Sequence, residues 1–142
     1  MVTFVGFPDW LERGEGDVRE WLHMVARVHS CRIDYLQYSF VNDDEITRIN
    51  TEHLKHNYAT DIITFGYSEG SRVSGEVFIS LDTVTSNAQG FNVSRSDELD
   101  RVMAHGLLHL IGFNDSTKGE KQRMREEEEK CLILRPKKLS NS

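Results

Sequence analysis

The chain has 142 residues, of which 38% are hydrophobic and 28% are charged. This is the size and composition of one globular domain with a core of its own, and it excludes a collagenous chain or one disordered throughout. Acidic residues outnumber basic ones by 23 to 17, so the net charge of −6 excludes a surface coated in basic charge but leaves room for a local basic groove. We therefore expect residues 1–142 to form a single domain.

Helices and strands are predicted to alternate along the first third of the chain. Helical spacing over residues 17–29 predicts a helix with one buried face, formed by Val18, Trp21, Leu22, Val25 and Val28. The stretch Ile33–Val41 is rich in aromatic and β-branched residues and predicts a strand. Asn42 or Asp43 can then cap a short helix, whose apolar residues are Ile46, Ile49 and Leu54.

The middle of the chain is predicted to form a hairpin followed by a helix. Strands are expected at Asp61–Tyr67 and Val73–Leu81, and the polar stretch Ser68–Gly70 between them suits a tight connection. A helix is expected over Asp82–Gln89, with Gly90 as its end.

Two helices are predicted to complete the fold. The first has Ser96 as its cap and Gly112 as its terminator, and the second spans residues 117–134 with an exposed face at Glu126–Glu129. Residues 136–142 are expected to be a mobile tail. This order of elements predicts an α/β (α+β) fold, in which a small mixed sheet of about four strands packs against about five helices.

The chain shows no sign of export or of membrane insertion. No apolar run approaches the roughly 18 residues that a membrane span needs, and the segment MVTFVGFPDW at its beginning lacks the features of a secretory signal. Cys31 and Cys131 lie far apart in the sequence without CxxC spacing, which favours free thiols in a reducing cytosol over a disulfide. We expect a cytoplasmic protein without a membrane or DNA partner.

The segment with the clearest chemistry contains two histidines one helical turn apart. Side chains at positions i and i+4 share a helix face, so His105 and His109 can bind one metal ion. Gly112 ends the helix and lets the chain fold back, which makes Asp115 a candidate third ligand. Three protein ligands leave a fourth position for water, as in a catalytic zinc site, and we expect one zinc ion per chain. The alternative is an ordinary HxxxH pair without a metal.

The same segment differs from the zinc-peptidase helix. That helix carries H-E-x-x-H, in which the glutamate acts as the general base, whereas position 106 here is glycine. The sequence thus argues against a peptidase mechanism.

Four sequence blocks resemble the YbeY family of bacterial endoribonucleases, which act in rRNA maturation. The family signature H-G-x-L-H-L-x-G-[YF]-D-H is similar to residues 105–115, HGLLHLIGFND. Upstream, the family's T-D-V-L-S-F resembles Thr60–Phe65, its G-D-I-x-I-S resembles Gly75–Ser80, and its acidic helix leading into L-N resembles Asp43–Asn50. The resemblance spans roughly residues 39–131 with the blocks in order.

The chain departs from the family pattern at two positions. The third metal-binding histidine of the family corresponds to Asp115, and an additional carboxylate makes a bound metal a weaker Lewis acid. A family arginine corresponds to Leu54, so its phosphate contact is lost or transferred to a neighbour such as Lys55 or His56. RNA binding is therefore expected to be weak and sensitive to salt.

Roles for several other residues stay open. Asp61 is either a cap or turn residue or a carboxylate that orients a ligating imidazole. Glu76 is more readily a solvated strand residue than a group facing the cleft. Four histidines are expected to be solvated or at the surface: His23, His29, His53 and His56. Four cations form either a basic rim for RNA phosphates or a scattered surface: Arg72, Lys118, Lys121 and Arg123.

The resemblance implies a zinc-dependent, single-strand-specific endoribonuclease. Its expected partner is ribosomal RNA in the small ribosomal subunit, with roles in maturation of the 3′ end of that RNA and in ribosome quality control. No residue stands out as the general base. The alternatives are a metal-stabilised ribosome assembly factor without cleavage activity, and a metal-dependent hydrolase of peptides or small molecules.

Overall fold

The computed structural model describes residues 1–54 and 59–136. The four strands of this part are β1 (Val2–Val5), β2 (Arg32–Val41), β3 (Ile62–Gly66) and β4 (Arg72–Ser80). Its five helices are α1 (Glu15–Val28), α2 (Asp43–Leu54), α3 (Leu81–Phe91), α4 (Arg95–Ile111) and α5 (Lys118–Ile133). The predicted α/β class, with a mixed sheet and five helices, is confirmed.

The four strands form one mixed sheet in the order β1-β2-β4-β3. Strand β2 pairs in parallel with both β1 and β4, and β3 pairs antiparallel with β4. The predicted hairpin between β3 and β4 is confirmed, and its turn is closed by reciprocal backbone hydrogen bonds between Glu69 and Arg72. The two parallel pairings are made by crossovers that contain α1 and α2.

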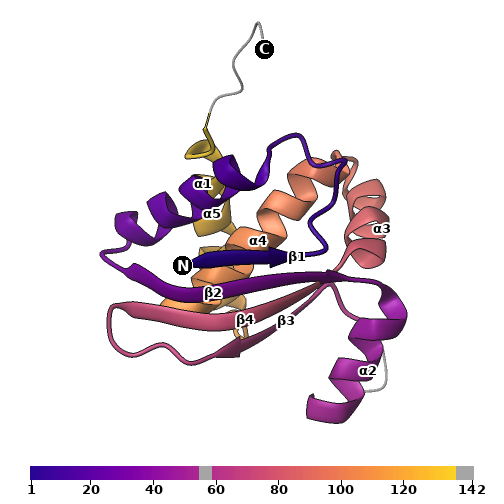
Figure 1. Cartoon of the computed structure of the whole chain (residues 1–142), viewed down its shortest axis with the longest axis horizontal. Coiled ribbons are helices and arrows are strands. Elements are labelled where there is room, and N and C mark those ends of the chain that lie inside the picture. The colour runs from indigo at the N-terminus through magenta and orange to yellow at the C-terminus, as the bar shows by residue number, and fades with distance from the viewer. Residues whose placement is uncertain (55–58, 137–142) are drawn as a thin grey trace, which may run out of the picture.

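Helix α4 lies across one face of the sheet, with α1 and α5 beside it on the same side (Figure 1). Helix α3 lies at one end of this layer, and α2 projects below the sheet in the same view. Helix α4 is buried along most of its length because it contacts the sheet as well as α1, α3 and α5. The segment with the histidine pair is therefore the central helix of the fold.

Two buried hydrogen bonds from aromatic side chains connect the layers of the core. Tyr38 on β2 donates its hydroxyl to the carbonyl oxygen of Met103 on α4 at 2.7 Å. Trp21 on α1 donates its indole N–H to the carbonyl oxygen of Cys131 on α5 at 2.8 Å. Because a buried polar group without a partner is costly, these bonds let both large rings lie fully buried.

Several element boundaries differ from the sequence prediction. Strand β1 was not among the predicted strands. Helix α3 continues through Gly90 to Phe91, because Asn92 takes the left-handed conformation that ends the helix. The cap of α4 is Ser94, whose side chain accepts a hydrogen bond from the backbone N–H of Asp97, and the prediction of Ser96 was wrong. Ser96 is buried and instead accepts a hydrogen bond from the backbone N–H of Glu12.

Both cysteines are free thiols, as the sequence predicts. Burial raises the pKa of the Cys131 thiol to about 12, so this side chain acts as a core residue. Within residues 1–54 and 59–136, none of the helices has the length and apolar character needed to cross a membrane. The predicted tail after Pro136, together with Lys55 and His56, lies outside the described residues.

Candidate metal centre

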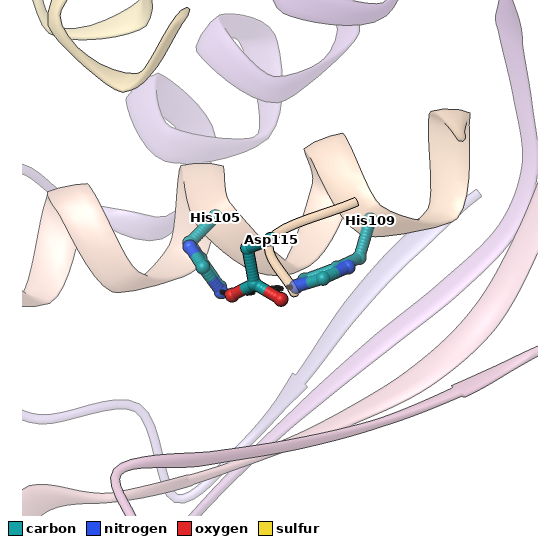
Figure 2. Close-up of side chains that lie close together, drawn as sticks. All are labelled: His105, His109 and Asp115. Carbon is teal, nitrogen blue, oxygen red and sulfur yellow. Dashed lines mark hydrogen bonds and ion pairs between the residues drawn. The ribbon is translucent and has the colours of Figure 1, made fainter. Parts of the chain in front are cut away.

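Helix α4 presents His105 and His109 on the same face, one turn apart. Figure 2 shows the two rings projecting from the helix so that their outer nitrogens approach each other. The Nε2 atoms of the two imidazoles are 3.1 Å apart. The helix itself is held against the core on its other faces, so the positions of both rings are set by a rigid element.

A chain reversal at Gly112 returns Asp115 to the histidine pair. Gly112 has a φ of 128°, which side-chain-bearing residues rarely adopt, and its N–H bonds to the carbonyl oxygens of Leu108 and His109. The next residue, Phe113, also donates its N–H to the Leu108 carbonyl. The chain then brings the Asp115 carboxylate across the two rings, as Figure 2 shows.

The three ligand atoms form a nearly regular triangle. Oδ2 of Asp115 lies 3.4 Å from Nε2 of His105 and 3.4 Å from Nε2 of His109. In a tetrahedral zinc site with bonds of about 2.0–2.1 Å, neighbouring ligand atoms are about 3.3 Å apart. The edges of 3.1, 3.4 and 3.4 Å therefore fit one tetrahedral ion above the triangle.

The contacts of His105 are compatible with a cation bound at the triangle. Nδ1 of His105 lies 2.5 Å from Oε2 of Glu128, and an ionised carboxylate can only accept a hydrogen bond. In the tautomer that carries its proton on Nδ1, Nε2 offers a lone pair toward Asp115. Two acceptors then face each other at 3.4 Å, and a cation bound between them would remove their repulsion. This donor set fits a zinc ion.

Glu128 is in turn held by a buried ion-pair network. Arg101 donates from Nη1 to Glu128 at 2.9 Å, and from Nε and Nη2 to Glu98 at 2.9 and 2.6 Å. Burial by itself would raise the pKa of Glu128, but the hydrogen bond to His105 and the charge of Arg101 hold it below its usual value. The network keeps Glu128 ionised and fixes the orientation of the His105 ring.

The role of Glu128 does not follow from the sequence prediction, in which the whole run Glu126–Glu129 is an exposed helix face. The structure corrects this: Glu126 and Glu129 are exposed, whereas Glu128 is buried with only 4% of its surface accessible. The available signal was helical spacing, because Glu128 falls on the same face as the buried residues Met124 and Cys131.

One side of the metal centre opens into a cavity of about 700 Å³ between α4 and β3. The accessible fractions of the three side chains are 17% for His105, 28% for His109 and 39% for Asp115, so the triangle faces solvent on this side. A fourth position on an ion held by this triangle would therefore be reachable by water.

Asp61 lies in the wall of this cavity, just before β3. Its pKa is raised by burial, against the opposing influence of the positive Arg101. The described hydrogen bonds include none between Asp61 and either imidazole; Glu128 makes the bond that orients His105. The role of Asp61 as an orienting carboxylate stays a prediction. Glu76 accepts a hydrogen bond from Tyr67 at 3.2 Å, away from the lining of this cavity.

The other histidines among the described residues lie apart from the triangle. His29 is not a plain surface residue as expected, because it bonds to the Val25 carbonyl at 2.9 Å and to Oε1 of Glu127 at 3.0 Å. It thus connects the end of α1 to α5. His23 is half-buried, which lowers its pKa, and His53 is exposed.

The four cations considered from the sequence do not form a single rim. Arg72 pairs with Asp34 at 3.0 Å, and Arg123 lies over the ring of Phe113 at 5.4 Å. Lys118 and Lys121 are exposed on α5, on the side that carries a further cation, Arg125.

Gly106 faces the sheet and not the ligand triangle. A Cβ atom at this position would lie 3.0 Å from Cδ1 of Ile62 and 3.1 Å from Cγ1 of Val77. The glutamate of a zinc-peptidase helix would have to enter this packed interface, far from a useful orientation. The close approach of α4 to the sheet therefore explains the glycine and disfavours peptidase chemistry.

Comparisons with known proteins identify the family and agree with the fold. The family model described as endoribonuclease YbeY matches residues 11–134. A protein named endoribonuclease YbeY from Bacteroides thetaiotaomicron is 44% identical over 131 residues, which cover 92% of this chain and 93% of that relative. A protein of the same name from Phocaeicola vulgatus is 48% identical over 114 residues, or 80% and 83% of the two chains.

A solved structure is also similar over most of the chain. The solution structure of TM1509 from Thermotoga maritima matches with a TM-score of 0.68 at 26% sequence identity, covering 94% of this chain and 88% of that one. The chain belongs to the endoribonuclease YbeY family.

Proposed function

We propose that this protein is a zinc-dependent, single-strand-specific endoribonuclease that binds one zinc ion per chain through His105, His109 and Asp115. Membership of the endoribonuclease YbeY family supports RNA phosphodiester hydrolysis as the reaction. The observation that carries the metal assignment is the triangle of two Nε2 atoms and one carboxylate oxygen, with edges of 3.1, 3.4 and 3.4 Å. Residues 1–142 would act as one catalytic domain.

The proposed substrate is ribosomal RNA of the small subunit, matured at its 3′ end, with a further role in ribosome quality control. This part of the proposal is supported by the family resemblance. Because bacterial ribosomes are assembled in the cytoplasm, a cytoplasmic location is part of the same proposal.

The residues of the site would have two roles: some would hold the metal, and others would line the cavity between α4 and β3. A bound zinc ion supplies Lewis-acid activation of water and of a phosphate oxygen. His105, whose ring is fixed by Glu128, and His109 provide neutral donors, and Asp115 contributes one negative charge. The cavity between α4 and β3 admits the substrate beside these ligands.

The decisive experiment compares RNA and protein substrates on the same purified sample. Cleavage of a single-stranded RNA, loss of cleavage after chelation and recovery with zinc are expected, while casein stays intact. A sample that holds zinc but leaves RNA uncut would favour the structural alternative, a metal-stabilised ribosome assembly factor. Zinc-dependent cleavage of casein would favour a peptide hydrolase. A double-stranded RNA of the same sequence is the control for strand specificity.

The metal assignment needs a test that does not depend on cleavage. Elemental analysis of the purified protein is expected to give one zinc per chain. The variant His109→Ala should lose it, whereas His53→Ala, which changes an exposed histidine outside the triangle, should retain it. Equal zinc content in the two variants would contradict the assignment.

A further inference from the structure

The two cavities beside the metal centre differ in their charge. The large cavity between α4 and β3 has no lysine or arginine among its described lining residues. A second cavity, of about 180 Å³, shares His105 and Asp115 with it and lies on the α5 side. Arg101, Lys121 and Arg125 contribute to the lining of this second cavity. The positive charge around the metal centre is therefore concentrated on the α5 side.

Arg101 is already neutralised by the buried carboxylates that hold it. Its three guanidinium nitrogens donate to Glu98 and Glu128 at distances of 2.6 to 2.9 Å. Lys121 and Arg125 are exposed, and neither has a carboxylate within ion-pair distance among residues 1–54 and 59–136. These two side chains are the cations that remain available to an anionic ligand in this cavity.

The spacing of Lys121 and Arg125 suits two neighbouring phosphates. They lie four residues apart on α5, which places them on one face and about 6 Å apart along the helix axis. This is close to the separation of adjacent phosphates in a nucleic-acid strand. Like charges at this spacing destabilise a helix when nothing compensates them. A bound polyanion would remove this repulsion.

We propose that Lys121 and Arg125 form a phosphate-binding arm that holds the RNA backbone next to the phosphodiester at the metal centre. This inference rests on the proposed nuclease function. It adds a path for the RNA strand, which runs from the metal centre along α5. Lys118, which lines the neighbouring surface hollow together with both residues, extends the arm toward the beginning of the helix. Glu126, which lines the same hollow, and Glu129 are exposed after Arg125 on α5 and limit the arm in that direction.

The test measures RNA binding in the absence of cleavage. Metal-free protein is titrated into a labelled single-stranded RNA at several salt concentrations, using the parent, Lys121→Gln and Arg125→Gln. Each variant should reduce the slope of log affinity against log salt by about 0.7, which corresponds to about fivefold weaker binding at 0.1 M salt. The matched control is Lys130→Gln, which removes the same charge from α5 at an exposed lysine paired with Glu127. It should bind RNA within about twofold of the parent.

Each result of the titration either supports the arm or overturns it. Equal weakening of RNA binding in all three variants would show that the overall charge of the protein causes the effect, and it would overturn the proposal. Parent-like RNA binding by Lys121→Gln and Arg125→Gln, in a protein whose parent binds and cleaves RNA, would overturn the arm and leave the nuclease function intact. If the zinc-loaded parent neither binds nor cleaves RNA, the proposed function fails, and the arm fails with it.

Two further measurements separate the arm from the metal centre. The zinc content of Lys121→Gln and Arg125→Gln should equal that of the parent, because neither residue belongs to the ligand triangle. With zinc present, KM for RNA should rise in both variants while kcat changes less. A loss of zinc would show that these residues support the metal centre and not the RNA backbone.

Discussion

Oε2 of Glu128 lies 2.5 Å from Nδ1 of His105, although the two residues are 23 positions apart and belong to different helices. This contact places the proton on Nδ1 and leaves Nε2 as a donor toward the metal. The other oxygen of the same carboxylate accepts a bond from Arg101 at 2.9 Å. The packing of α5 against α4 is therefore also what orients one candidate ligand.

Removal of the Glu128 carboxylate should weaken metal binding. Glu128→Ala is expected to lower zinc affinity by about 10–100-fold, because a freely rotating His105 loses its fixed tautomer. Competition with a chromophoric chelator measures this affinity, and melting of the metal-free protein shows whether the variant is folded. Glu129→Ala, which changes an exposed neighbour, is the control. Equal affinities of the two variants would show that Glu128 does not position the ligand.

Substitutions of Asp115 should show whether its carboxylate coordinates zinc. Asp115→His is expected to retain zinc, because imidazole is an equally good zinc ligand. Asp115→Ala should leave a two-histidine site. Its zinc affinity should fall by more than the roughly 10–100-fold that is typical when a residue that only hydrogen-bonds to a ligand is removed. Asn114→Ala serves as the adjacent control. If Asp115→Ala resists a mild chelator as well as the parent does, another side chain must complete the site.

Metal removal should lower the melting temperature. A ligand that binds only the native state stabilises it by about 2.7 kcal/mol when its concentration is 100 times its Kd. For a domain of this size we expect a decrease of about 8 °C upon chelation, and recovery when zinc is added back. Calorimetry with and without chelator measures this difference. An unchanged melting curve after verified metal removal would contradict the coupling.

The close packing of Gly106 predicts an effect on stability. Gly106→Ala should destabilise the protein by about 1 kcal/mol, because the strain against Ile62 and the fully buried Val77 exceeds the gain in helix propensity. Gly119→Ala is the matched control, since a Cβ there would contact nothing within 4 Å on α5. That variant should be neutral or slightly more stable in thermal unfolding. A stabilised Gly106→Ala would mean that α4 can move away from the sheet.

The contact between α1 and α5 should depend on pH through Glu127. Hydrogen bonds from His29 and Lys130 outweigh the opposing effect of partial burial and lower the pKa of Glu127. A depressed carboxylate pKa stabilises the fold above the unfolded pKa, and this contribution is lost as the pH falls through the folded value. Glu127→Gln should therefore melt about 3 °C below the parent at pH 7 and approach it below about pH 4.

Thermal unfolding of the parent and Glu127→Gln across this pH range tests the assignment. Glu126→Gln, at an exposed position beside it, is expected to track the parent throughout. A difference between Glu127→Gln and the parent that stays constant from pH 7 down to about pH 2, below the lowered pKa of Glu127, would show that the carboxylate charge is not responsible.

Local patterns in the sequence were enough to locate most of the fold and the candidate ligands. The five helices and three of the strands follow from apolar spacing, cap and terminator residues, and strand-type composition, and Thr117 begins α5 with the capping box that its side chain and Glu120 form. His105 and His109 share a helix face by spacing alone, and Gly112 provides the reversal that Asp115 needs. Each of these features depends on residues that are close together in the sequence, so it can be predicted without the tertiary structure.

Contacts between distant segments decided what the sequence could not show. Strand β1 is a strand because it pairs with β2, and Ser96 is buried because the segment around Glu12 packs against it. Glu128 belongs to a charged run that alone is typical of a solvated helix face, and only the packing of α5 on α4 buries it against Arg101 and His105. Burial of a charge is favourable only where opposite charges and hydrogen bonds are already in place, and that condition depends on the tertiary structure.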